Sequence, residues 1–66
     1  MENRLKVYRA MHDLTQQQLA DAVQVSRQTI HSIEKNRYVP STLLALKIAR
    51  RVEAKVEEIF ILEEDD

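Results

Sequence analysis

The central stretch of the chain, residues 14–35, places apolar side chains at the spacing of two short helices. Two apolar sets recur at intervals of three or four residues: first Leu19, Ala20 and Val23, then Ile30 and Ile33. Thr15 and Ser26 precede these sets as N-cap residues, and Gln18 follows Thr15 at the spacing of a capping box. The pattern predicts helices over about 16–23 and 27–35, with a sharp corner within residues 21–25.

A further helix is predicted before this stretch, over residues 4–12, with Asn3 as its N-cap and Asp13 at its end. The residues expected to face inward are Leu5, Tyr8 and either Met11 or His12.

Two more helices are predicted after residue 35. A loop over 36–40 leads to Ser41, which caps a helix over about 42–52, and a shorter helix follows over 56–61. The inner face of the longer helix is expected to contain Leu44, Ala45, Ile48, Ala49 and Val52. Residues 63–66 are all acidic and are expected to be frayed.

Two short capped helices joined by so tight a turn are typical of the helix-turn-helix, whose second helix can enter a DNA major groove. The stretch resembles that of phage Cro and the lambdoid repressors, the xenobiotic-response-element-like regulators. The matching residues are Leu14, Thr15, Gln16, Leu19, Ala20, Val25, Ser26, Ile30, Ile33 and Glu34. The resemblance continues at 40–41, 45–49 and 56–60. It implies an all-α, five-helix lambda-repressor-like DNA-binding domain over 1–62, followed by an acidic tail over 63–66.

The chain departs from this family in containing no glycine. Relatives often have glycine at four places, which here hold Asp13, Gln24, Asn36 or Arg37, and Glu53. A left-handed Gln or Glu costs roughly 1 kcal/mol. We expect the fold to tolerate these residues, with the geometry of the turns left open.

The charge is divided between the two ends of the chain. The net charge is −1, but residues 1–51 carry nine Lys and Arg against four acids, whereas residues 52–66 carry one Lys against seven acids. A basic body suits DNA, and the acidic end either points away from it or serves only solubility. With no cysteine, no apolar run long enough for a membrane and no signal-peptide pattern, we expect a soluble, cytoplasmic protein.

The resemblance places Arg27, Gln28 and Ser32 at the base-reading positions of the recognition helix. Arg27 could form a bidentate contact with guanine and Gln28 with adenine, while Thr29 could touch a thymine methyl or a phosphate. Expected phosphate contacts are Gln16, Gln17, Ser26, His31, Lys35, Asn36 and Arg37. The alternative for this surface is a solvated polar helix face.

Two further sets of residues have expected structural roles. The resemblance implies an ion pair between Arg9 and Glu34 that fastens the first helix to the recognition helix, with a DNA contact as the alternative for Arg9. Apolar residues near the C-terminus exceed what a minimal core needs, and exposed apolar groups often form a partner surface. The predicted dimer interface comprises Val56, Phe60, Ile61 and Leu62, with core membership as the alternative for each.

Enzymatic and cofactor-dependent functions are not predicted. His12 and Asp13 are sequence neighbours that do not face each other on a helix, and His31 has no second ligand at metal-binding spacing. The chain contains no glycine-rich phosphate loop or nucleophile motif. We therefore predict no metal and no cofactor.

The sequence favours a transcriptional regulator that binds double-stranded DNA. We expect a homodimer that places two recognition helices in successive major grooves of a palindromic operator, about 34 Å apart. Repression by promoter occlusion is favoured over activation through a polymerase contact. The alternative is an antitoxin or a protein-interaction module with the same fold and a protein partner.

Overall fold

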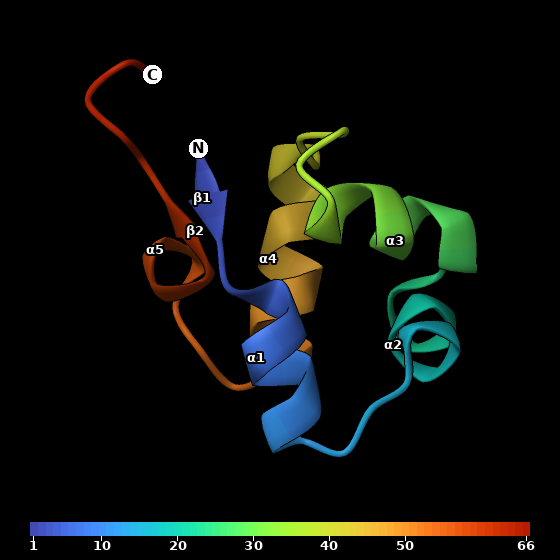
Figure 1. The fold of residues 1–66 in the computed structure, drawn as a ribbon. Coiled ribbons are helices and arrows are strands. Elements are labelled where there is room, and N and C mark those ends of the chain that lie inside the picture. Colours follow the sequence, from blue (N-terminus) through green and yellow to red (C-terminus); the bar gives the residue numbers. More distant parts are fainter.

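The computed structural model describes all 66 residues and contains five helices and two short strands (Figure 1). The elements in chain order are β1 (Glu2–Asn3), α1 (Leu5–Met11), α2 (Gln16–Val23), α3 (Arg27–Glu34), α4 (Thr42–Arg51), α5 (Val56–Ile59) and β2 (Phe60–Ile61). The first four helices lie within a residue or two of their predicted bounds, which confirms the helical architecture. No helix combines the length and apolar character needed to cross a bilayer.

The two strands were not predicted. They pair antiparallel, with Glu2 opposite Ile61 and Asn3 opposite Phe60, and the N–H of Arg4 donates to the Ile59 carbonyl oxygen at 2.7 Å. The prediction that the last helix reaches Ile61 was therefore wrong. Pairing with β1 supplies hydrogen-bond partners for the backbone N–H and C=O groups of β2. The extended backbone at Phe60 lets its side chain pack into the core.

The core consists of thirteen buried residues, all apolar, drawn from all five helices and from β2. In Figure 1, α4 lies behind α1, with α2 and α3 on one side and α5 with the strands on the other. The predicted inner face of α4 is buried, as expected. At the end of α1, Met11 is 68% exposed whereas His12 is partly buried. Of the two alternatives for the inward-facing residue, the structure therefore selects His12.

Local capping determines where three helices begin. Thr15 and Gln18 form the predicted capping box, with the Gln18 N–H 3.0 Å from Thr15 Oγ1 and the Thr15 N–H 2.9 Å from Gln18 Oε1. Ser26 and Ser41 cap α3 and α4 in the predicted way. Because α2 continues to Val23, the corner between α2 and α3 is tighter than residues 21–25.

Four residues have a left-handed backbone, with φ angles of 54° at Asp13, 64° at Gln24, 59° at Asn36 and 54° at Glu53. These are the places where relatives often have glycine, and the structure selects Asn36 over Arg37. Asn and Asp adopt this conformation at modest cost, whereas Gln and Glu adopt it at a higher one.

The two ends of the chain lie together, on the side of the molecule away from α2 (Figure 1). The α-amine of Met1 donates to Asp66 Oδ1 at 3.0 Å and lies 3.3 Å from Glu63 Oε1. The expectation that residues 63–66 fray was wrong, because the Glu63 N–H also donates to Asp66 and closes a turn. The hydrogen bond to Asp66 raises the pKa of the amine. The bond from the Glu63 backbone, followed by the bond from the amine, lowers the pKa of Asp66.

Candidate nucleic-acid interface

Helix α3 presents a polar face to solvent because its apolar residues, Ile30 and Ile33, are both buried in the core. Of the predicted base-reading residues, Arg27 and Gln28 are exposed, and Thr29 and Ser32 are partly exposed. All four therefore lie on or beside the accessible side of the helix.

The start of α3 is held by Ser26. Its Oγ accepts the Thr29 N–H at 3.2 Å and lies 3.0 Å from the Thr29 hydroxyl. The two hydroxyls are hydrogen-bonded to each other, and the Thr29 methyl takes no part in this contact. The main structural role of Ser26 is therefore to cap α3.

A shallow hollow of about 260 Å³ lies between α3 and the loop that follows it. It is lined by Ser26, Gln28, Thr29, Ser32, Arg37 and Tyr38. The hollow brings three predicted base-reading residues next to Arg37, a predicted phosphate contact. The sequence separation between Gln28 and Arg37 gave no indication that they would share one hollow.

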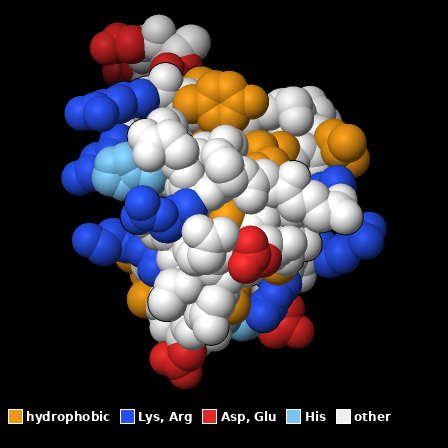
Figure 2. Space-filling view, turned by 90° about the vertical axis from the view of Figure 1, so that its right-hand side faces the viewer, with side chains coloured by type: hydrophobic (Ala, Val, Ile, Leu, Met, Phe, Trp, Pro, Cys, Tyr) orange, Lys and Arg blue, Asp and Glu red, His pale blue; other side chains and the backbone are white.

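Cationic side chains border the face that contains α2 and α3 (Figure 2). Lys, Arg and His side chains gather along its left and right margins, and between them lie mostly uncharged side chains and backbone, with some hydrophobic side chains and an acidic one near the centre. On α3, Arg27, His31 and Lys35 recur at intervals of four residues, which places them along one side of the helix. A central polar strip between cationic margins suits a groove flanked by two phosphate backbones.

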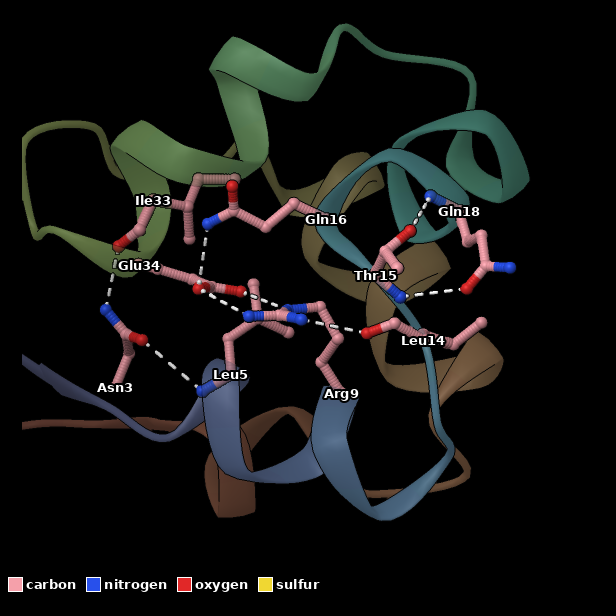
Figure 3. A network of polar contacts seen from close by, with 9 residues as sticks. All are labelled: Asn3, Leu5, Arg9, Leu14, Thr15, Gln16, Gln18, Ile33 and Glu34. Carbon is pink, nitrogen blue, oxygen red and sulfur yellow. Dashed lines mark hydrogen bonds and ion pairs between the residues drawn. The ribbon is translucent and has the colours of Figure 1, made fainter.

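The far end of α3 is anchored by Arg9 and Glu34 (Figure 3). Arg9 Nε lies 2.8 Å from Glu34 Oε2, and Arg9 Nη1 donates to the Leu14 carbonyl oxygen at 2.8 Å. The side chain of Glu34 is 6% exposed and that of Arg9 is 15% exposed. The pair has the geometry expected of a structural ion pair, and it uses the guanidinium that a DNA contact by Arg9 would require.

Gln16 and Gln17, at the start of α2, also make contacts within the protein. Gln16 Nε2 donates to Glu34 Oε1 at 3.2 Å, and Gln17 Nε2 donates to Asp21 at 2.8 Å. Through this contact Gln16 braces the end of the recognition helix, where Glu34 is the last residue of α3. This contact is possible because Arg9 holds the Glu34 carboxylate inward, where its other oxygen can accept the hydrogen bond from Gln16.

The predicted dimer residues differ in accessibility. Phe60 is buried at 8% exposure, Val56 and Ile61 are partly buried, and Leu62 is 78% exposed. Phe60 is thus a core residue of the single chain, although it also lines, with Val56, an apolar hollow of about 310 Å³. The hollow is also lined by Leu46, one of the apolar residues in excess of a minimal core, and by Val39, which was not predicted.

One polar residue close to the interface, Asn3, was not among the predicted site residues. Asn3 was expected to cap the first helix, but its Nδ2 donates to the Ile33 carbonyl oxygen at the end of α3 and to Asn36 Oδ1. No local pattern could have indicated these contacts, because both partners are distant in the sequence.

The comparison with protein families decides the identity. The family model described as "Helix-turn-helix" matches residues 5–59. The chain belongs to the Cro/C1-type helix-turn-helix family. The function is therefore that of a DNA-binding regulator of transcription.

Members of this family from distant organisms match the whole chain. An uncharacterised HTH-type transcriptional regulator of Methanocaldococcus jannaschii is 56% identical over 66 residues, covering 100% of both chains. The uncharacterised HTH-type transcriptional regulator YgzD of Bacillus subtilis is 47% identical, again over 100% of both chains.

Solved structures of two Cro/C1-like regulators have the same fold. The restriction-modification controller protein C.AhdI from Aeromonas hydrophila aligns with a TM-score of 0.77 at 25% identity, over 85% of each chain. The clp gene regulator ClgR from Corynebacterium glutamicum aligns with a TM-score of 0.76 at 28% identity, over 82% of this chain. The present chain spans 57% of that ClgR chain.

Proposed function

We propose that the protein is a cytoplasmic, homodimeric repressor that reads a palindromic operator with α3. The observation that carries this proposal is the solvent-facing polar side of α3, with Arg27 and Gln28 exposed in its first turn. Arg27 would pair with guanine and Gln28 with adenine in the major groove, with Ser32 and the Thr29 methyl contacting neighbouring bases.

The phosphate contacts would come from residues at both ends of the reading surface. Lys35, Asn36 and Arg37 are exposed immediately after α3, and Gln16, Gln17, Ser26 and His31 complete the proposed set. Lys35 and Arg37 would release condensed counterions from DNA, so affinity would fall steeply with salt.

Dimerisation would use the side of the molecule that contains α5 and the apolar hollow. Leu46 is 55% exposed and Leu62 is 78% exposed, and the hollow beside Leu46 offers a place for an apolar side chain. A two-fold dimer would set two recognition helices about 34 Å apart, on successive turns of the groove. Repression would follow from occupation of a promoter.

Selection of bound DNA from a random pool, at low and at moderate salt, tests the proposal. Enrichment of a palindrome with half-sites about 10 base pairs apart is the expected result. Enrichment of a single half-site would contradict the dimer but retain base reading by α3. If no sequence is enriched at either salt, the operator-reading proposal fails and the protein-interaction alternative gains support.

A further inference from the structure

The side-chain amide of Asn3 joins three separate parts of the fold. Its Nδ2 donates to the Ile33 carbonyl oxygen and to Asn36 Oδ1, both at 2.8 Å. Its Oδ1 accepts the Leu5 N–H at 3.3 Å. Figure 3 shows this amide between the first residue of α1 and the last turn of α3. The backbone of Asn3 is meanwhile held in β1, opposite Phe60.

Asn36 is where the chain leaves the recognition helix. Its φ of 59° reverses the chain, so that the Arg37 N–H returns to the Ser32 carbonyl oxygen at 2.9 Å. Lys35 and Arg37 stand on either side of Asn36, and both are exposed. Lys35 is held to α3 by its own N–H, which donates to the His31 carbonyl oxygen at 3.0 Å, so a change of backbone conformation at Asn36 would move Arg37 relative to α3.

We propose that Asn3 is a positioning residue for DNA binding: it holds Asn36 in its left-handed conformation, so that Arg37 is preorganised beside α3 to meet a phosphate. Asn3 itself touches no DNA in this arrangement. The paired terminal strands supply the rigid support, because the backbone of Asn3 is fixed by its pairing with β2. The inference rests on the proposed DNA-reading function of α3.

The chemistry of the site requires an amide. Nδ2 donates to two acceptors, on Ile33 and Asn36, while Oδ1 accepts the Leu5 N–H. Only Asn offers two donors and an acceptor on so short a side chain. Asn3→Ala removes all three hydrogen bonds without changing the net charge, which matters because charge alone alters DNA affinity.

The test is the affinity of Asn3→Ala for the selected operator, measured over a range of salt concentrations. We expect binding to weaken about tenfold, from the loss of preorganisation. We also expect the slope of log K against log salt to decrease in magnitude by about two for the dimer, because one phosphate contact is lost in each protomer. If the substitution merely unfolds a constant fraction of the protein, the apparent affinity falls but the salt slope stays the same. The slope therefore distinguishes a positioning role of Asn3 from a contribution to stability alone. Val7→Ala, a neutral truncation at an exposed position of α1, should match the wild type.

A second substitution provides a rescue. Asn36→Gly adopts the left-handed conformation without support from a side chain. The double variant Asn3→Ala, Asn36→Gly should therefore recover the wild-type slope and most of the affinity. A wild-type slope in Asn3→Ala, or a slope that Asn36→Gly does not restore, would overturn the inference while leaving the DNA-reading function intact. Failure of the wild-type protein to select any DNA would instead overturn the proposed function.

Discussion

Arg9 and Glu34 face each other across the interface of α1 and α3, with Arg9 Nε 2.8 Å and Nη2 3.2 Å from the two carboxylate oxygens. This two-pronged geometry is the strong form of a carboxylate–guanidinium pair. Arg9 also binds the Leu14 carbonyl oxygen, and Gln16 binds Glu34. The orientation of the recognition helix therefore depends on a shielded polar network as well as on its two buried isoleucines.

Removing one partner of this pair should be costly. Glu34→Ala leaves the Arg9 guanidinium shielded and without its carboxylate, so we expect the free energy of unfolding to fall by about 3–5 kcal/mol. Urea unfolding followed by circular dichroism measures the change. The double variant Arg9→Met, Glu34→Leu should recover much of the loss, because it leaves no unpaired charge. A loss below about 1 kcal/mol for Glu34→Ala would show that the pair behaves as a solvent-screened one.

The left-handed residue at the corner of the helix-turn-helix offers a stabilising substitution. Gln24→Gly relieves a φ of 64°, and we expect a gain of up to about 1 kcal/mol after the added entropy of the unfolded chain is subtracted. Thermal unfolding measures this gain in stability. Ala22→Gly, at an exposed position inside α2, is the matched control and should instead cost about 1 kcal/mol. Equal losses in both variants would mean that Gln24 carries no strain.

Arg27 and Arg37 should respond differently to substitution. Arg27→Ala should relax the preference at one base position, with a loss of about 1–3 kcal/mol for the best operator. Arg37→Ala should weaken binding to all sequences about equally and reduce the salt slope by about two for the dimer, one for each protomer. Competition binding with operator variants at several salt concentrations separates the two outcomes. A uniform loss in Arg27→Ala would remove it from the base-reading set.

Leu46 provides the test of the dimer. Leu46→Glu introduces a charge at the rim of the apolar hollow, and burying this charge in an interface would be unfavourable. We expect sedimentation to show a shift from dimer to monomer, with the fold retained because Leu46 is exposed in the single chain. Met11→Glu, at an exposed position on α1, should remain dimeric. A dimer that survives Leu46→Glu must use another surface.

The contact between the two ends of the chain should depend on pH. The pKa of the Met1 amine is raised above its ordinary value of 8.0, so its stabilising effect is complete below pH 8 and is lost as pH rises through the raised value. The pKa of Asp66 is lowered from 3.8, so its effect is present above that pH and is lost as pH falls through the lowered value. Chemical shifts of the Glu63 amide should therefore be constant between about pH 4 and 8 and change outside this window. Asp66→Asn should remove the part of the acidic transition that comes from the Asp66 carboxylate.

The sequence by itself determined the helices, their starts and the motif they form. Thr15, Ser26 and Ser41 cap helices through bonds to residues three positions away, so the signal is local and can be read from the chain. The resemblance indicated the four places where relatives often have glycine, with Asn36 or Arg37 left open at one of them, and the structure has a left-handed residue at each. A turn of fixed geometry requires the same backbone whatever its side chain. The apolar spacing of α4 likewise predicted which side would be buried.

Only the tertiary structure decided the roles of Asn3 and Phe60. Asn3 suits a helix cap, and the stretch before Leu62 suits another turn of helix, when each is read from its own neighbours. The folded chain brings these segments side by side, and their backbones then pair as strands. That pairing directs Phe60 into the core and the Asn3 amide to the end of α3. Both outcomes depend on contacts between residues at opposite ends of the chain, and local propensity carries no information about such contacts.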